Sequence, residues 1–194
     1  MSKTQIGAEA RRSAAVEGAT GVFLRYGYAR TTMAELATAA GLSRPTLYEV
    51  FPGKDDLFAA VIGRLSQQTI EQYRDMLPKL RTLRTKLHYF CGDWATHGLK
   101  LMERHPDAKD LFDFRFPAVR QMYEDFITFL VEVLSNANFS TSMPIEKVVR
   151  NMVFSLRGLK DAATDVKHME ALVKLQVDVF LAALEHKGSS AGRL

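Results

Sequence analysis

The residues with the clearest chemistry lie between positions 44 and 49 of the chain. Arg44, Thr46, Tyr48 and Glu49 carry hydrogen-bond donors and acceptors, and Pro45 stands among them. We predict that these five residues occupy the outer side and the N-terminal end of a short helix. A helix that enters the major groove of DNA presents residues to bases and phosphates from that position. The pattern therefore predicts nucleic-acid recognition, provided that neighbouring elements hold the helix.

A helix over residues 33–40 is the first of these elements. Thr32 and Glu35 have the spacing of a capping box, in which each side chain bonds to the backbone N–H of the other. One face of the helix is apolar and recurs at helical spacing, and it consists of Met33, Leu36, Ala37 and Ala40. The capping box and this face predict a short helix that packs on a neighbour.

The turn that follows has the residues that end one helix and begin another. Gly41 stops the first helix, and Ser43 is a good N-cap for a second helix of fewer than about ten residues. Leu47, Val50 and Phe51 are expected to point inward from this second helix. We call residues 32–51 the reader below. Similar helix pairs occur in all-helical proteins that never touch DNA, so the pair alone leaves both interpretations open.

Residues around the reader favour the DNA interpretation. The stretch resembles the N-terminal domain of TetR-family transcriptional regulators over roughly the first quarter of the chain. The matching positions are Gly27-Tyr28, Thr31-Thr32, Leu36-Ala37, Ala40-Gly41, Ser43, Thr46-Leu47-Tyr48, Phe51, Lys54 and Leu57. The resemblance implies that Tyr48 and Lys54 grip the DNA backbone. The DNA-contacting set that we expect comprises Thr31, Thr32, Ser43, Arg44, Pro45, Thr46, Tyr48, Glu49 and Lys54.

Composition and charge are consistent with this interpretation. The chain has 194 residues, of which 47% are hydrophobic and 25% are charged, enough for a sizeable core. Residues 1–54 hold seven Lys and Arg against four acidic residues, so most of the net charge of +4 lies there, as suits phosphate binding. We find no apolar run long enough for a membrane span and no signal peptide, and Cys91 is the only cysteine. We therefore expect a cytoplasmic protein.

The periodicity of the remaining sequence is helical throughout. We predict an all-α fold of about nine helices, with a helix-turn-helix domain over residues 1–53 and a regulatory and dimerisation domain over residues 54–194. The expected helices after the reader are 54–77, 81–104, 117–135, 145–164 and 166–185, with a short helix or turn over 107–116.

Aromatic residues in the second domain suggest a small-molecule pocket. Trp94 lies one turn from Gly98, and a large aromatic beside a glycine leaves a dent of the kind that lines a ligand cavity. The same residues are also ordinary core candidates, and both interpretations stay open. The candidate pocket set is Phe90, Trp94, His97, Phe112, Arg115, Tyr123 and Phe126.

Metal binding and catalysis are not predicted. His88, Cys91, Asp93 and His97 point in different directions from one helix at about 100° per residue, so they cannot converge on one ion. We find no glycine-rich phosphate loop, no H-E-x-x-H and no G-x-S-x-G. We expect no cofactor and no catalytic residue, and an all-helical enzyme or metal sensor is the least favoured alternative.

The last two predicted helices are apolar on two sides. Such helices lie centrally in their own domain or meet a second copy of themselves. TetR-like proteins dimerise through these helices, and the interface set that we expect is Val149, Met152, Val153, Leu156, Val173, Val177, Phe180 and Leu184. Leu172, Leu175 and Val179 form a second stripe.

One short recognition helix contacts few base pairs, so two are needed to discriminate among genomic sites. We therefore expect a homodimer that binds a palindromic operator in double-stranded DNA. The resemblance implies a repressor that a small, largely apolar effector releases from its operator. A DNA-binding dimer without any small-molecule ligand is the alternative.

Overall fold

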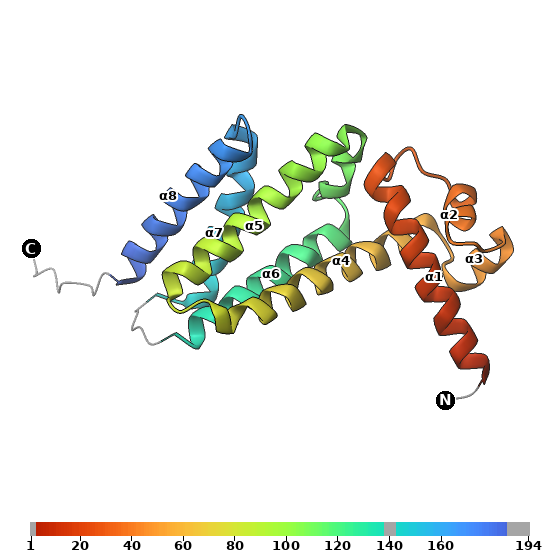
Figure 1. Cartoon of the computed structure of the whole chain (residues 1–194), viewed down its shortest axis with the longest axis horizontal. Coiled ribbons are helices and arrows are strands. Elements are labelled where there is room, and N and C mark those ends of the chain that lie inside the picture. The colour runs from red at the N-terminus through yellow and green to blue at the C-terminus, as the bar shows by residue number, and fades with distance from the viewer. Residues whose placement is uncertain (1–2, 138–142, 186–194) are drawn as a thin grey trace, which may run out of the picture. The chain divides into compact units, whose positions relative to one another are not determined.

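The computed structural model describes residues 3–137 and 143–185, and within these residues all regular secondary structure is helical. The α-helices are α1 (Lys3–Tyr26), α2 (Met33–Ala39), α3 (Arg44–Val50), α4 (Lys54–Met76), α5 (Leu83–Arg104), α6 (Pro117–Ser135), α7 (Ile145–Ala162) and α8 (Val166–Glu185). Two 3-10 segments, η1 (Leu77–Lys79) and η2 (Pro106–Phe112), lie between them (Figure 1). The prediction of an all-α fold is confirmed.

The element bounds follow the helix-ending residues of the sequence closely. The second helix of the reader runs from Arg44 to Val50, directly after the expected N-cap. α7 ends at Ala162, two residues before the expected end. The loop expected over residues 136–144 lies partly outside the described residues, and the tail expected over 186–194 lies wholly outside them.

The chain divides into two compact units. The first unit comprises residues 1–68 and 101–122, and the second unit comprises residues 69–100 and 123–194. Three helices, α4, α5 and α6, therefore run from one unit into the other. The functional boundary between residues 53 and 54 stays a prediction.

In the first unit, α1 packs against α2 and α3 (Figure 1). A Cβ atom on Gly18 of α1 would lie 2.6 Å from backbone atoms of Ala39 and Ala40, so only glycine lets these helices approach so closely. The rings of Phe23 and Phe58 meet edge to face with centroids 5.3 Å apart. Burying an aromatic ring in this way contributes about 1.5–3 kcal/mol.

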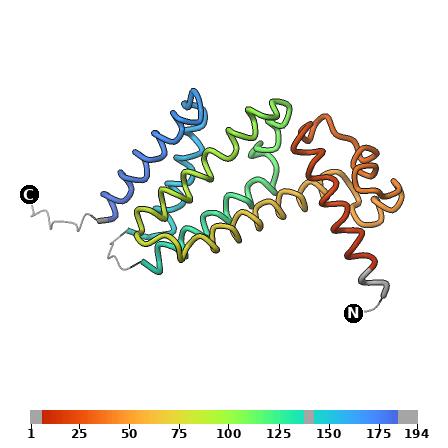
Figure 2. The backbone as a smooth tube through the Cα atoms, viewed as in Figure 1, coloured from red at the N-terminus to blue at the C-terminus, as the bar shows by residue number. Residues whose placement is uncertain are grey.

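In the second unit, a cluster of aromatic rings forms the centre of the core. The ring of Trp94 stacks on Phe126 with centroids 4.2 Å apart, and Tyr123 meets Trp94 edge to face at 5.7 Å. α7 and α8 pack against each other, and the tube in Figure 2 turns back between them. Among the described residues, no helix is long and apolar enough to cross a membrane.

Candidate nucleic-acid interface

The reader begins with a complete capping box. The Thr32 hydroxyl oxygen accepts from the Glu35 backbone N–H at 3.3 Å, and the Glu35 carboxylate accepts from the Thr32 backbone N–H at 2.8 Å. The bond that the Glu35 carboxylate accepts from the Thr32 N–H, followed by the one that it accepts from the Thr32 hydroxyl, holds the pKa of that carboxyl below its usual value. The predicted capping box is confirmed, and it fixes the direction in which α2 leaves the preceding corner.

The turn between α2 and α3 is built as the sequence predicts. Gly41 adopts a φ of 65°, in the left-handed region that favours glycine. The side chain of Ser43 accepts from the Thr46 backbone N–H at 3.2 Å, as an N-cap does. Pro45 lies in the first turn of α3, where a missing N–H leaves no helical hydrogen bond unmade.

These caps leave α3 with one buried and one open face. Leu47 is fully buried, and Phe51, which caps the C-terminal end, is 1% exposed. The exposed residues of the helix are Arg44, Pro45, Tyr48 and Glu49, while Thr46 is half-buried. The Arg44 guanidinium lies over the Tyr48 ring, 5.7 Å from its centroid. Five of the nine residues predicted to contact DNA therefore lie together on α3.

Two arginines of α1 contact the C-terminal part of α3. Arg12 donates to the Val50 carbonyl at 3.2 Å, and its guanidinium lies 4.3 Å from the centroid of the Phe51 ring. Arg11 forms an exposed ion pair with Glu49 at 3.5 Å. Neither contact was predicted, and the two adjacent arginines at positions 11 and 12 are the signal in the sequence that could have indicated them. An exposed pair of this kind contributes little stability, so the Glu49 carboxylate can leave it easily.

Lys54 stabilises the corner between α1 and α2, which comprises residues 27–31. Its ammonium donates to the Tyr28 carbonyl at 3.0 Å and to the Thr31 carbonyl at 2.9 Å, and it lies 4.1 Å from the centroid of the Tyr28 ring. Thr31 is buried, and its hydroxyl donates to the Gly27 carbonyl at 2.7 Å. These hydrogen bonds to the backbone of the corner were not predicted for Lys54. Its contact with a DNA phosphate stays a prediction.

Tyr28 carries the apolar side of the corner. Its ring packs edge to face on Phe58 at 5.1 Å between centroids, and its hydroxyl donates to the Asp55 carboxylate. Partial burial, followed by the hydrogen bond to Asp55, raises the pKa of Tyr28 to about 12. Tyr28 therefore packs on α1 and α4 and has a structural role in the corner.

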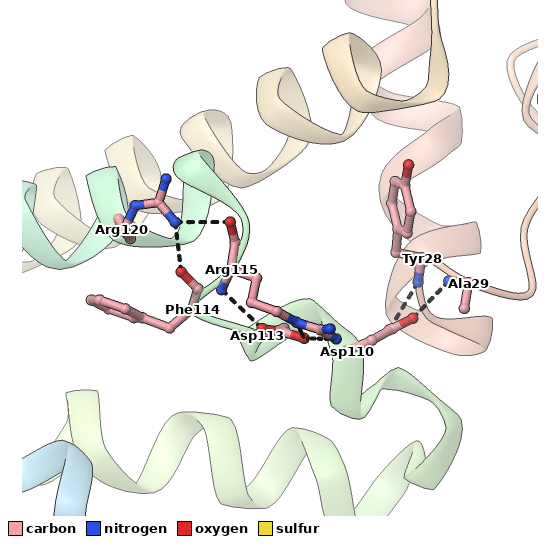
Figure 3. Close-up of polar contacts among 7 residues, drawn as sticks. All are labelled: Tyr28, Ala29, Asp110, Asp113, Phe114, Arg115 and Arg120. Carbon is pink, nitrogen blue, oxygen red and sulfur yellow. Dashed lines mark hydrogen bonds and ion pairs between the residues drawn. The ribbon is translucent and has the colours of Figure 1, made fainter.

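A carboxylate from η2 holds the backbone of the same corner. Asp110 accepts from the Tyr28 N–H at 2.9 Å through Oδ1 and from the Ala29 N–H at 2.6 Å through Oδ2 (Figure 3). Arg30 pairs with Asp107, also on η2, at 2.7 Å. Both contacts lie within the first unit. No local sequence pattern predicts the Asp110 contact, because Asp110 lies 82 positions after Tyr28.

Known proteins are similar to this chain in sequence over the reader and in fold over most of its length. Residues 15–61 match the model of the bacterial regulatory proteins of the tetR family. The chain is 43% identical over 53 residues to the HTH-type transcriptional repressor ComR of Escherichia coli K12. A TetR-family transcriptional regulator of Pectobacterium atrosepticum has a similar structure, with a TM-score of 0.72 and 18% identity, over 96% of this chain and 99% of that one. Residues 15–61 therefore resemble the tetR family in sequence, and the described fold resembles that of a solved TetR-family structure.

The extent of each likeness limits what it shows about this chain. The match to ComR spans 27% of this chain and 25% of ComR. The structure of FadR from Bacillus subtilis in complex with stearoyl-CoA is also similar, with a TM-score of 0.61 and 14% identity, over 88% of this chain and 98% of that one. At such identities, the structural likeness concerns the fold alone.

The candidate pocket residues lie in three places. Phe90, Trp94, Tyr123 and Phe126 are buried in the aromatic core of the second unit. His97 is exposed on the same unit. Phe112 and Arg115 belong to the first unit, where the exposed Arg115 guanidinium pairs with Asp113 at 2.6 Å. The structure therefore brings four of the seven residues into one cluster.

A groove of about 450 Å³ lies between α5 and α8 in the second unit. It includes none of the candidate pocket residues, and its walls carry Tyr89, Asp93, Lys100, Glu170 and Lys174. The buried hydroxyl of Tyr73 donates to the Asp93 carboxylate at 2.7 Å, and burial followed by the nearby Asp93 charge raises the pKa of Tyr73. The signal for this groove was a polar stripe on α5, because Tyr89, Asp93 and Lys100 share one helix face.

The stripe predicted for the dimer interface packs inside the chain. Its members Val149, Met152, Val153, Leu156, Val173, Val177 and Leu184 are each at most 2% exposed, and Phe180 is half-buried. The apolar residues that α7 and α8 leave open are Phe154, Leu175 and Val179, which are 37%, 65% and 55% exposed. Both apolar stripes of α8 were recognised in the sequence. The stripe that was expected to contact a second protomer packs instead on the core of its own chain.

Across residues 3–137 and 143–185, no three His, Cys, Asp or Glu side chains are placed to hold a metal ion. The single cysteine, Cys91, is buried, and burial raises the pKa of its thiol to about 12. At neutral pH such a thiol stays protonated and unreactive.

Proposed function

We propose that this chain is a DNA-binding transcriptional regulator of the TetR family that inserts α3 into the major groove. The observation that carries the proposal is the open face of α3, where Arg44, Tyr48 and Glu49 are exposed above a buried Leu47. A helix of this length with its N-terminal end free is the part of a helix-turn-helix that reaches base edges. Repression is the direction that we infer, because ComR, 43% identical over 53 residues, is named a repressor.

The proposed contacts divide into base reading and backbone gripping. Arg44, Thr46 and Glu49 are assigned to base edges, and Pro45 lies against the same groove. Tyr48, Lys54, Thr32 and Ser43 are assigned to phosphates, which position a protein on DNA without reading its sequence. Thr31 is buried and accepts from Lys54 through its carbonyl, so we assign it an indirect part in the contact.

The phosphate assignment has a matched control within the first unit. Tyr48 and Tyr26 are 40% and 44% exposed, and each has an arginine over its ring. Tyr48→Ala should weaken binding to operator and random DNA alike by about tenfold, the loss of about 1.4 kcal/mol. Tyr26→Ala should change neither affinity more than about twofold. Equal losses for the two variants, or none for Tyr48→Ala, would contradict the assignment.

Base reading has a different signature. Arg44→Ala should weaken operator binding more than random binding, because a good base contact discriminates by about 1–3 kcal/mol. Titrations of operator and scrambled duplexes at two salt concentrations measure the difference. A uniform loss on both duplexes would move Arg44 from the base-reading set to the phosphate set.

We further propose that the regulator acts as a homodimer through the open stripe of α7 and α8. Leu175 and Val179 lie one turn apart on α8 and are more than half exposed, and Phe154 adds an exposed ring from α7. A two-fold dimer would present two readers to a palindrome whose half-sites lie about 34–36 Å apart, or a multiple of that.

The dimer proposal can be tested with neighbouring substitutions on α8. Leu175→Glu should shift the protein from dimer to monomer in sedimentation equilibrium, because a charge would be buried in the interface. Lys174→Glu, one residue away and already exposed, should leave the dimer intact. A wild-type monomer, or a Leu175→Glu variant that sediments as the wild-type dimer, would contradict the proposed interface.

We also propose that a small-molecule effector acts on the second unit. The support is the aromatic cluster around Trp94 and the complex of the similar FadR structure with stearoyl-CoA. A ligand that binds only the folded state must raise the thermal midpoint, and one that parts the Trp94 and Phe126 rings must change Trp94 fluorescence. A panel of acyl-CoA and aromatic compounds tests this. Failure of every compound to stabilise the protein would favour a regulator without a small ligand.

A further inference from the structure

Two opposite charges hold the corner between α1 and α2 from different elements. Lys54 at the start of α4 takes the carbonyls of Tyr28 and Thr31, and Asp110 on η2 takes the N–H groups of Tyr28 and Ala29. Tyr28 therefore has its carbonyl bound by a cation and its N–H bound by an anion. The corner leads directly into Thr32, the N-cap of α2.

The Asp110 contact is specific to the shape of the backbone at the end of α1. Gly27 adopts a φ of 77°, so the next two N–H groups lie beyond the helix and are free to converge on one anion. Each carboxylate oxygen of Asp110 takes one of them, which is a charge-assisted arrangement. A Cβ atom on Gly27 would lie 2.4 Å from Asp110 Oδ1 and 2.5 Å from the Asp107 carbonyl oxygen. Glycine is thus required for η2 to seat here.

The segment that carries Asp110 is itself anchored to the start of α6. Arg120 donates to the carbonyls of Phe114 and Arg115, each at 2.8 Å (Figure 3). The Phe116 ring packs on Tyr28 with centroids 4.7 Å apart. A shift of residues 106–116 would therefore act on the corner through its backbone and through its aromatic side chain.

We propose that Asp110 is the positioning residue through which η2 holds the reader in its DNA-binding arrangement. The inference rests on the proposed function, because it concerns how DNA binding is maintained. Asp110 touches no residue assigned to DNA, so its effect passes through the corner and the capping box of α2. A movement of η2 that withdraws the carboxylate would release the N–H groups of Tyr28 and Ala29, four and three residues before the N-cap Thr32. This release would lower the affinity for DNA.

The first test needs no DNA. Amide hydrogen exchange of the full chain is compared for wild type, Asp110→Ala and Asp110→Asn, with Asp107→Ala as the control that removes only the exposed pair with Arg30. Exchange at Tyr28 and Ala29 should rise tenfold or more in Asp110→Ala, less in Asp110→Asn, and not in Asp107→Ala. The Leu47 amide, bonded to the Ser43 carbonyl, reports whether α3 stays folded. Unchanged exchange at Tyr28 and Ala29 in Asp110→Ala would overturn the proposal.

The second test measures binding to a duplex selected by the wild-type protein from a random pool. Asp110→Ala should bind about tenfold more weakly, Asp110→Asn should be intermediate because its amide oxygen still accepts one N–H, and Asp107→Ala should stay within about twofold. Wild-type affinity in Asp110→Ala would overturn the positioning role and leave the proposed function standing. A wild-type protein that binds no DNA would overturn the proposed function itself, whatever the exchange result.

A third test asks whether η2 senses DNA. Lys109→Cys places a single reactive thiol on η2, because Cys91 is buried with a raised pKa. A fluorine tag on this thiol should change its resonance when DNA binds, since coupling between two places is reciprocal. The change should disappear in the double variant with Asp110→Ala. A tag that responds equally with and without Asp110 would overturn the proposal.

Discussion

The reader with its preceding corner, in the first unit, and the core of the second unit depend on different kinds of internal contact. In the first unit, side chains bond to backbone groups at the ends of elements: Thr32 and Ser43 cap helices, Lys54 takes two carbonyls, and Asp110 takes two N–H groups. In the second unit, the centre is a stack of aromatic rings around Trp94 and Phe126. Directional polar contacts fix how short elements are aimed, whereas apolar packing fixes mainly which faces are covered.

This difference has a consequence for function. A reader must present a few side chains at a defined angle, so its short helices need contacts with fixed direction. A unit that responds to a small molecule must instead rearrange its interior, and flat rings can part and stack again at modest cost. We therefore expect the reader to depend on directional polar contacts and the core of the second unit to depend on aromatic packing.

The largest effect should come from removing a ring from the second unit. Phe126→Ala should lower the free energy of unfolding by about 3–5 kcal/mol, because Phe126 is fully buried and the cavity cannot close. Thr128→Ala, exposed on the same helix, should change it by less than about 0.5 kcal/mol. Urea denaturation measures both. A loss below about 1 kcal/mol for Phe126→Ala would show that the aromatic stack does not dominate this unit.

Substitutions of two glycines can separate how much the seating of η2 contributes to the stability of the first unit. Gly27 and Gly41 both have positive φ, but a Cβ on Gly41 would meet nothing within 4 Å, whereas one on Gly27 would collide with Asp110 and Asp107. Gly41→Ala should cost about 1–2 kcal/mol from backbone strain. Gly27→Ala should cost clearly more, about 3 kcal/mol or above, because it also displaces η2. Equal losses in thermal denaturation would mean that η2 yields freely.

The cap of the recognition helix gives a smaller effect. Ser43→Ala should destabilise the protein by about 1 kcal/mol, because the Thr46 N–H loses its acceptor, whereas Ser43→Gly should cost only a few tenths. If aim matters more than stability, DNA affinity of Ser43→Ala should fall further than the lost folded fraction explains. Affinity that follows the folded fraction alone would weaken the contrast between the units.

The smallest effect should come from a polar contact in the second unit. Arg150 and Glu124 form a two-point ion pair at 2.5 and 2.8 Å, with side chains 39% and 41% exposed. The hydrogen bond from Arg150 lowers the pKa of Glu124, so the pair stabilises the fold above the unfolded value near 4.5. That stability is lost as the pH falls through the lower folded value.

Glu124→Gln should therefore cost less than about 1 kcal/mol at pH 7, since solvent screens the pair. The difference from wild type should shrink as the pH falls below about 4.5, the usual value of the carboxyl. Denaturation at a series of pH values measures it. A cost of several kcal/mol at pH 7 would place polar contacts above aromatic packing in this unit.

The same difference in contacts explains what could be predicted from the sequence. Thr32 with Glu35, Gly41 and Ser43 act on residues within a few positions of themselves, so their types and offsets predict the reader's geometry correctly. Asp110 acts on residues more than 80 positions away, and no local pattern marks it.

The apolar stripes of α8 show what periodicity in the sequence cannot predict. Val177 and Val179 are chemically alike and two residues apart, yet the first is fully buried and the second is 55% exposed. Periodicity reveals both stripes, but which one faces the chain's own core depends on how α7 packs beside α8. The candidate pocket stays a prediction for the same reason, because whether an aromatic fills a core or lines a cavity is decided by its neighbours in space.

We propose above that two copies of α3, one from each protomer of a homodimer, bind one palindromic DNA site. The most direct measurement is selection of bound duplexes from a random pool by the full chain, followed by sequencing. We expect enrichment of a palindrome whose half-sites are centred about 34–36 Å apart or a multiple of that, and we expect Arg44→Ala to shift the enriched bases. Absence of enrichment, or a single unsymmetrical site, would contradict it.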